Sequence, residues 1–267
     1  MRKYVVVEKL SGETPLAAIG RWKGEHPEYA EVPASYAGRL DPMASGKLLV
    51  LLGEECRRQK EYTKLDKEYE IEVLLDIGSD TGDALGLAEY AGKTTPVDNF
   101  SRLDEILRAE EGSHVRPYPH FSSKTVQGKP LFMYALEGTL STIQIPTHAE
   151  HIYRIKRRDV TSLSAVKLSQ RVDAFLAKAP TSDEPSKALG ADFRIEAVRA
   201  SWQRLISEAR DREFVVLSLR VVCGSGTYMR SLAPRLGEAL GTRALALSIR
   251  RTKIGRYWRR LHYLHEV

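Results

Sequence analysis

The order of strand-like and helix-like segments constrains the fold of this 267-residue chain most strongly. The clearest strand is 67–78, in which Tyr69, Ile71 and Val73 alternate with polar residues. Further strands are expected at 3–9, 213–224 and 244–258. Strands and helices follow one another without a strict strand–helix–strand repeat, and this mixed order predicts an α+β fold rather than a doubly wound α/β fold.

Helix-like segments lie between these strands. Residues 14–24 begin with Thr14 as an N-cap and Pro15 at the first helical position. Further helices are expected at 98–112, 128–138, 162–178, 194–210 and 227–241. Residues 47–66 start apolar and become charged, which predicts another helix that runs out to the surface. The stretch 178–194 is rich in Pro, Ser, Ala and charge, which indicates a loop or an insertion.

The sequence contains no pattern typical of a membrane segment or a secretory signal. No stretch approaches about 18 consecutive apolar residues, the length that a spanning helix needs. The N-terminal apolar run covers only 4–7, and no small-residue cleavage site follows it. Cys56 and Cys223 share no motif spacing with each other or with histidines. We therefore expect reduced thiols in a cytoplasmic protein and no metal site, because zinc would lack ligands.

The formal net charge is +6, and the basic residues are clustered. In 249–266, Lys and Arg are interleaved with Tyr and Trp, and 153–159 is a second basic cluster. Positive charge beside aromatic rings suits a phosphate backbone and stacked bases, so a nucleic acid is one expected partner. A solvated basic face without a partner would explain the charge alone equally well.

Asp41 stands between Leu40 and Pro42, just before an apolar run, in the stretch AGRLDPMASGKLLVLLGEE. One interpretation is an N-cap, with proline at the first position of a single helical turn. The other is a catalytic carboxylate, which needs a nearby cation to stay ionised when it is desolvated. Arg39 points away from it on an extended chain, so Arg230, after a Gly-rich turn in GSGTYMRSL, is the best candidate for that cation.

Four segments carry motifs, and they occur in the order AGRLDPMASGKLLVLLGE (37–54), DKEYEIEVLLDIGSDTGDALG (66–86), SSKTVQGKPLFMYALEG (122–138) and VVCGSGTYMRSLAPRLGEALGTRALALSIRRTKIGRY (221–257). Together they resemble the motifs of the TruB-type tRNA pseudouridine synthases, in the same order. Each motif alone is weak, whereas four in order are specific.

The resemblance implies a fold, a domain organisation and a reaction. The fold would be an α+β pseudouridine-synthase-like catalytic domain, with a central mixed, mostly antiparallel sheet flanked by helices. A single domain would cover 1–267, with an insertion around 160–212 and no C-terminal PUA domain. The implied activity is the cofactor-free isomerisation of uridine to pseudouridine, most readily at the T-loop uridine of tRNA (position 55). The same chemistry on another RNA such as rRNA, or a catalytically silent RNA-binding protein or tRNA-folding chaperone, stays open as an alternative.

The resemblance also implies site residues. Asp41 would be the nucleophile or, in another account, the group that starts glycosidic cleavage. Tyr69 would stack on the target base, and removal of the C5 proton is a second role open to it. Arg230 would pair with Asp41. The residues expected to bind substrate are Tyr36, Arg39, Lys129, Tyr228, Ile249, Arg250 and Arg251. Tyr36 stands where the family usually has histidine. The implied partner is RNA, above all the T-arm of tRNA, without an obligate protein partner.

Two further carboxylates, Asp80 and Asp83, lie in the stretch SDTGDALG. Their spacing could suggest a calcium loop, but the segment is too short and lacks the glutamate that closes such a loop. We therefore expect a turn that supports the catalytic loop or touches RNA.

Overall fold

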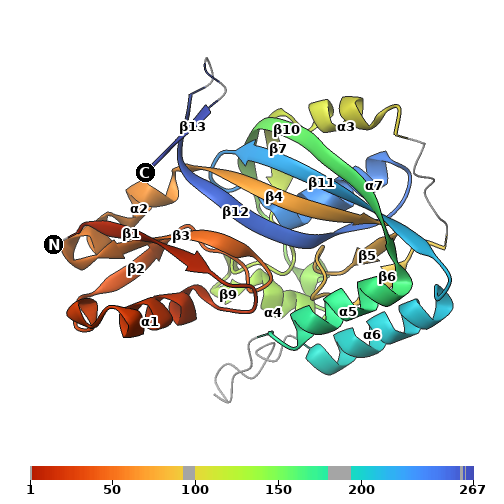
Figure 1. The fold of residues 1–267 in the computed structure, drawn as a ribbon, viewed down its shortest axis with the longest axis horizontal. Coiled ribbons are helices and arrows are strands. Elements are labelled where there is room, and N and C mark those ends of the chain that lie inside the picture. The colour runs from red at the N-terminus through yellow and green to blue at the C-terminus, as the bar shows by residue number, and fades with distance from the viewer. Residues whose placement is uncertain (1, 93–99, 180–193, 259–260, 262) are drawn as a thin grey trace.

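The computed structural model describes residues 2–92, 100–179, 194–258, 261 and 263–267, and in this part of the chain it forms one large curved sheet with helices packed around it (Figure 1). The sheet has the strand order β1-β3-β12-β4-β11-β10-β7, while β2 pairs with β3 and β13 pairs with β12. These strands are β1 Tyr4–Lys9, β2 Ala34–Ala37, β3 Ser45–Leu52, β4 Asp66–Leu75, β7 Gly112–Pro117, β10 Thr147–Ser164, β11 Glu213–Cys223, β12 Ala244–Trp258 and β13 Tyr263–Glu266.

The neighbouring strands of this sheet pair antiparallel, except that β3 and β12 pair parallel over two residues. A mixed, mostly antiparallel sheet with flanking helices was the expected fold class, and it is confirmed. The helices are α1 Pro15–Glu25, α2 Gln59–Thr63, α3 Leu103–Ala109, α4 Leu131–Leu136, α5 Ala165–Leu176, α6 Ile195–Glu208 and α7 Met229–Ala239.

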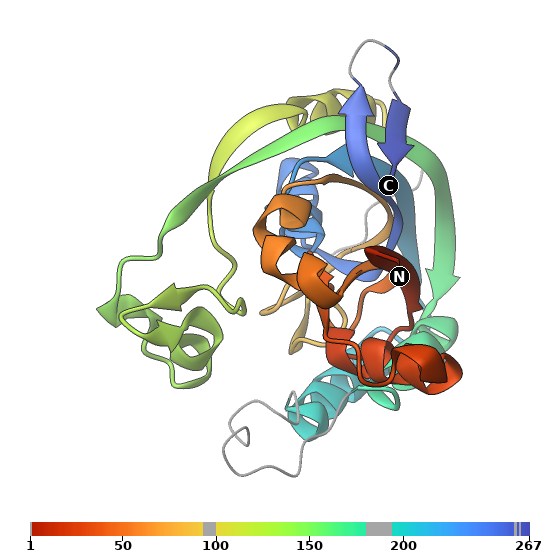
Figure 2. The same ribbon diagram turned by 90° about the vertical axis from the view of Figure 1, so that its left-hand side faces the viewer.

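Two small ribbons lie outside the main sheet. One pairs β5 Ile77–Ser79 with β6 Ala88–Tyr90, and the other pairs β8 Thr125–Val126 with β9 Lys129–Pro130. The second ribbon and α4 belong to residues 118–146, which project from the body of the molecule in Figure 2, and we call this segment the arm.

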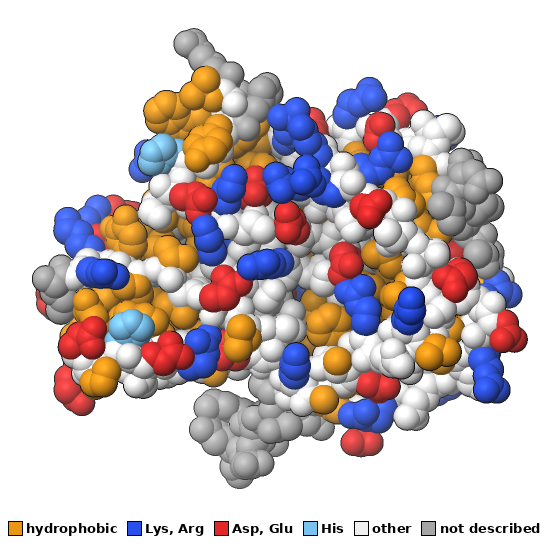
Figure 3. Space-filling model, viewed as in Figure 1, with side chains coloured by type: hydrophobic (Ala, Val, Ile, Leu, Met, Phe, Trp, Pro, Cys, Tyr) orange, Lys and Arg blue, Asp and Glu red, His pale blue; other side chains and the backbone are white. Residues whose placement is uncertain are grey.

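The main core lies between the sheet and the helices α5, α6 and α7. Leu217 of β11, Leu245 of β12 and Leu232 of α7 are fully buried in one continuous apolar cluster, and Trp202 of α6 joins them. A second cluster lies under α1, where Trp22 packs against β1 and β3. Charged side chains of both signs are interspersed on the face of the molecule seen in Figure 3.

Most of the predicted elements are confirmed within the described residues. The Thr14 hydroxyl accepts a hydrogen bond from the amide of Ala17 at 3.1 Å, as an N-cap should. Helix α7 ends just before Gly241, which has a φ of 73°. The helices expected at 162–178 and 194–210 are α5 and α6.

The helix predicted over 47–66 is wrong. Its apolar half forms β3, a strand that pairs with β1 on one side and β12 on the other. Both faces of β3 are covered, so Leu48 to Leu52 are all buried and show no alternation. A short apolar run of this kind cannot be assigned to a strand or a helix by periodicity. The charged half forms a 3₁₀ turn at Gly53–Arg58 followed by α2.

Two other segments differ from the sequence expectation. The helix predicted over 98–112 forms α3, which is shorter, and 98–99 lie outside the described residues. Gly112 does not end this helix but begins β7. The long strand β10 was not predicted, because its basic middle section shows no alternating apolar pattern.

The single domain over 1–267 and the insertion at 160–212 stay predictions. Of the loop expected at 178–194, residues 180–193 lie outside the described residues. The described helices include none that is both long and apolar enough to cross a membrane.

Candidate active site

A cavity of about 430 Å³ opens between the sheet, the arm and the start of α7. Distant parts of the chain line it: the turn between β2 and β3, strand β4, the loop between β5 and β6, the arm, and strand β12. Its size is typical of a small-molecule or single-nucleotide site.

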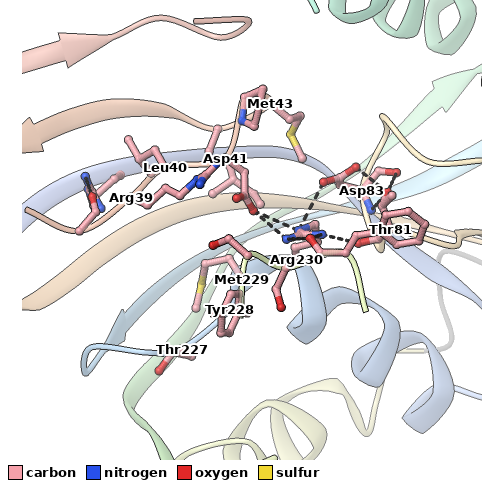
Figure 4. Close-up of a pocket in the computed structure, with 18 of the residues that line it drawn as sticks. Arg39, Leu40, Asp41, Met43, Thr81, Asp83, Thr227, Tyr228, Met229 and Arg230 are labelled. Carbon is pink, nitrogen blue, oxygen red and sulfur yellow. Dashed lines mark hydrogen bonds and ion pairs between the residues drawn. The ribbon is translucent and has the colours of Figure 1, made fainter. Parts of the chain in front are cut away.

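Asp41 lies in a turn that enters this cavity (Figure 4). The amide of Ala44 donates to the carbonyl oxygen of Asp41 at 3.0 Å, which closes a β-turn, and β3 starts at Ser45. The N-cap interpretation of Asp41 is therefore wrong, because no helix follows. The side chain is instead turned into the cavity and is 36% exposed.

Arg230, in the first turn of α7, pairs with Asp41. Its Nη2 lies 3.0 Å from Oδ2 of Asp41, and its Nε donates to the same oxygen at 3.1 Å. The Oδ1 atom of Asp41 accepts no hydrogen bond from any described residue. One carboxylate oxygen is thus fixed by a cation, while the other, in a side chain that lines the cavity, is left without a hydrogen bond from the described part of the chain.

The guanidinium of Arg230 is enclosed by groups from two other segments. Its Nη1 donates to the carbonyl oxygens of Thr81 and Phe121, both at 3.2 Å, and Nη2 also donates to Phe121. A second carboxylate, Asp83, lies 3.6 Å from Nε (Figure 4). Burial alone would lower the pKa of the guanidinium, but the charges of Asp41 and Asp83 outweigh burial and raise the pKa.

Asp83 is itself buried, and burial raises the pKa of its carboxyl while the charge of Arg230 opposes the rise. Its Oδ1 accepts hydrogen bonds from the Thr81 hydroxyl at 2.7 Å and the Leu85 amide at 3.0 Å. A turn that supports the catalytic loop or touches RNA was expected here. The segment contacts Arg230 through the carbonyl oxygen of Thr81 and the carboxylate of Asp83, and Arg230 in turn holds Asp41.

Tyr69 of β4 and Ile249 of β12 line the cavity from the sheet. Tyr69 is buried, and burial raises the pKa of its hydroxyl. Arg251 is paired with Tyr69 across β4 and β12, and its guanidinium donates to the carbonyl oxygens of Lys47 at 2.6 Å and Gly38 at 3.0 Å. The sheet thus presents an aromatic and an apolar side chain beneath the Asp41 turn.

Gly46 allows the Asp41 turn to lie against β12. It has a φ of 102°, and a Cβ at this position would lie 2.2 Å from the carbonyl oxygen of Arg251. Any L-residue with a side chain would therefore push β3 away from β12 or strain the backbone.

Lys9, at the end of β1, holds the same turn from below. Its buried ammonium donates to the carbonyl oxygens of Ala44 at 2.5 Å and Pro42 at 3.3 Å. Burial, with a smaller contribution from the charge of Arg251, lowers the pKa of Lys9 to about 8, although the charges of Glu13 and Asp41 oppose the shift. Sequence reasoning missed this residue, since a lysine at a strand end usually faces solvent.

Tyr228, just before α7, lines the cavity, and its ring packs against two aromatic residues behind it, His148 of β10 and Tyr118 at the start of the arm. Its ring contacts His148 edge-on at 5.4 Å and Tyr118 at 6.2 Å between centroids. Tyr118 and His148 also pack on each other at 4.3 Å.

The structure gathers seven of the ten predicted site residues at the cavity. They are Arg39, Asp41, Tyr69, Tyr228, Arg230, Ile249 and Arg251. The other three lie elsewhere. Tyr36 packs against the cluster under α1, Lys129 pairs with Glu137 in the arm, and Arg250 pairs with Glu8 at 3.1 Å.

The different placement of Arg250 and Arg251 follows from strand geometry. Neighbouring residues of a strand point to opposite faces of the sheet. Arg251 is in register with Tyr69, on the cavity face, whereas Arg250 is in register with Glu70, which pairs with Arg220 on the other face. Arg251 therefore lies on the cavity face of the sheet, and Arg250 lies on the opposite face.

Three backbone features were not predictable from residue types: the carbonyl oxygens of Thr81 and Phe121 and the turn oxygens bound by Lys9. Among the described residues, no three histidine, cysteine or acidic side chains are grouped so that they could hold a metal ion.

Comparisons with known proteins identify the family of this chain. Residues 29–174 match the TruB family pseudouridylate synthase model, which describes the N-terminal domain of that family. A tRNA pseudouridine synthase B of Borreliella burgdorferi (strain ZS7) is 27% identical over 222 residues, which are 83% of this chain and 60% of the relative. A protein with the same name from Ralstonia nicotianae is 31% identical over 83% of this chain and 54% of its own length. The chain thus spans little more than half of these relatives.

The fold is also similar to a solved structure described as a Cbf5–Nop10–Gar1 complex. The similarity has a TM-score of 0.53 at 18% sequence identity and covers 94% of this chain and 48% of that one. At this identity the likeness concerns the fold alone.

The depressed pKa of Lys9 gives a testable pH dependence. Between about pH 8 and pH 10.5, the Lys9 side chain binds more protons in the unfolded chain than in the folded protein. The contribution of Lys9 to the free energy of unfolding therefore increases as the pH rises through this range. Lys9→Met removes this gain, which amounts to at most about 3 kcal/mol. Urea unfolding across this pH range measures the difference.

Lys3→Met is the matched control, because Lys3 is exposed just before the same strand. It should follow the wild type across the window. A Lys9→Met variant that also follows the wild type would show that the ammonium is not desolvated beneath the turn.

Proposed function

We propose that this chain, which belongs to the TruB family of pseudouridylate synthases, isomerises uridine to pseudouridine in RNA without a cofactor. The observation that carries the proposal is the carboxylate of Asp41 in the lining of a cavity, with one oxygen fixed by Arg230 and the other not hydrogen-bonded by any described residue. A buried cation keeps such a carboxylate ionised and oriented, as a nucleophile requires.

The proposed reaction uses the chain's own side chains. Asp41 starts cleavage of the bond between N1 of uracil and C1′ of the ribose. The uracil then rotates in the cavity, its C5 bonds to C1′, the proton on C5 passes to water, and N1 takes up a proton in exchange. Atoms balance without a cofactor, because product and substrate are isomers.

We assign Tyr69 to stacking on the base rather than to proton removal. Burial raises the pKa of its hydroxyl, so the phenol stays protonated at neutral pH and is a poor proton acceptor. Its ring lies in the cavity wall together with Ile249, where an aromatic and an apolar surface can receive a flipped base.

The target nucleotide has to leave its stack to reach Asp41, because the cavity is too small for a helix. We propose that the substrate is the T-loop uridine of tRNA at position 55. The support is the printed name of the relatives, tRNA pseudouridine synthase B. Another RNA with an exposed loop uridine is the alternative.

Arg39 is proposed to contact the RNA backbone at the mouth of the cavity. Its side chain is exposed beside the Asp41 turn, and no acidic side chain among the described residues lies within ion-pair distance of it. An exposed, uncompensated arginine at a site entrance suits a phosphate. Arg259 and Arg260, which belong to the basic cluster at 249–266, lie outside the described residues.

Asp41→Asn tests the proposed chemistry. The variant keeps the side-chain shape but loses the nucleophilic charge, so we expect no detectable isomerisation and RNA binding within about threefold of wild type. The assay is tritium release from an unmodified tRNA transcript labelled at C5 of uridine, with the position mapped afterwards. Asp104→Asn, at an exposed site in α3, is the control and should keep full activity.

Turnover by Asp41→Asn at the wild-type rate would refute the role of Asp41. Release from ribosomal RNA but not from tRNA would keep the reaction and change the substrate. No release from any RNA by the wild type would favour an RNA-binding protein without catalysis.

Arg39→Ala tests the RNA contact. We expect weaker RNA binding and a slope of log K against log salt that is smaller by about one, since one phosphate contact is lost. Arg250→Ala is the matched control, because Arg250 lies on the other sheet face and pairs with Glu8. Equal effects of the two substitutions on the salt slope would contradict the proposed position of the RNA.

A further inference from the structure

Helices α5 and α6 lie side by side beneath the β5–β6 ribbon, at the end of the long strands β10 and β11 (Figure 1). Arg199 of α6 pairs with Asp173 of α5 at 3.6 Å. The sequence analysis placed both helices in an insertion around 160–212 and assigned no role to it. The contacts of α6 with the loop between β5 and β6 indicate a role.

Helix α6 is fixed to the loop between β5 and β6. The indole nitrogen of Trp202 donates to the carbonyl oxygen of Ala84 at 3.1 Å in a buried contact. The hydroxyl of Ser201 accepts from the amide of Ala88 at 3.0 Å. This loop is the one that supplies Thr81 and Asp83 to Arg230, so α6 is one contact away from the catalytic pair.

Arg194, immediately before α6, extends this support to the cavity. Its Nη1 lies 2.7 Å from Oδ2 of Asp80, while Oδ1 of Asp80 accepts from the amide of Leu87 at 2.8 Å. Asp80 therefore closes the loop on itself and joins it to α6. Gly86 permits this tight closure, because a Cβ there would lie 2.7 Å from Oδ1 of Asp80.

The same guanidinium also reaches the arm. Its central carbon lies 4.7 Å from the centre of the Phe121 ring, which is within the range of a cation–π contact. Phe121 supplies a carbonyl oxygen to Arg230, and Thr81, next to Asp80, supplies another. Arg194 thus touches both segments whose carbonyl oxygens enclose Arg230.

We propose that Arg194 is a positioning residue for the Asp41–Arg230 pair. It holds the 79–87 loop and the start of the arm at the separation at which both carbonyl oxygens bond one guanidinium. The proposal rests on the proposed function, in which Arg230 orients Asp41. It assigns the α5–α6 pair to support of the site rather than to recognition of RNA.

Kinetics distinguish positioning from RNA binding. Arg194→Ala should lower kcat by about 10- to 100-fold, because a small displacement of a catalytic group is costly, while KM for the RNA stays within about threefold. Arg194→Lys keeps the charge beside Asp80 but loses the planar group over Phe121, so it should restore kcat in part. Arg199→Ala changes another arginine of the α6 segment and breaks its pair with Asp173 of α5, and it should leave both parameters unchanged.

Asp80→Asn removes the ion pair between Asp80 and Arg194 from the Asp80 side, and it is a second test of this contact. The amide oxygen still accepts from Leu87, but the ion pair with Arg194 is lost. We expect kcat to fall in the same direction, and the double variant with Arg194→Ala should be no slower than the slower single variant. Fully additive losses would overturn the proposal. A rise in KM with unchanged kcat would also overturn it and make Arg194 an RNA contact.

Amide hydrogen exchange on the full chain tests, without an activity assay, whether Arg194 holds the 79–87 loop and the start of the arm together. Arg194→Ala should speed exchange in both 79–87 and 118–124, whereas Arg199→Ala should change neither. Unchanged exchange in either segment would overturn the proposal that Arg194 holds the two segments together. If the wild type converts no RNA, the proposed function fails, and the exchange result still decides whether Arg194 joins the two segments.

Discussion

The ion pair between Asp41 and Arg230 is the interaction on which the rest of the site depends. A buried guanidinium is strongly destabilising unless all of its donors are bonded. Here the donors are bonded by Asp41, by Thr81 and by Phe121, with Asp83 nearby. These groups come from distant parts of the chain, so this arrangement forms only when those parts have folded together.

Each of the supporting segments is held by a contact of its own. Lys9 binds the carbonyl oxygens of the Asp41 turn, and Gly46 lets that turn lie against β12. Trp202 of α6 and Arg194 hold the loop that carries Thr81 and Asp83. The sheet supplies Tyr69 on one face while the charged side chains on the other face pair among themselves. The candidate site thus lies on one side of one sheet.

The fold class, most helices and strands, and Arg230 as the partner of Asp41 could be predicted from the sequence. Strand alternation, helix caps and ordered motifs can all be recognised from residue types alone. Prediction from the sequence failed at β3, where burial on both faces removed the alternation, and at β10, where basic side chains hid the strand. It also placed Arg250 and Arg251 in one site, although a strand separates neighbours onto opposite faces. The carbonyl oxygens around Arg230 carry no residue signal and required the structure.

The most direct test of the account is the single-turnover rate of pseudouridine formation by Arg230→Lys at saturating tRNA. Lysine keeps the positive charge but carries all its donors on one nitrogen, so it lacks the planar fork that bonds Asp41, Thr81 and Phe121 from three nitrogens. The account predicts a rate at least about 100-fold below wild type, with RNA affinity within about threefold and a folded protein by urea unfolding. A rate near that of the wild type would show that charge alone suffices and would contradict the enclosed, oriented pair as the basis of the site.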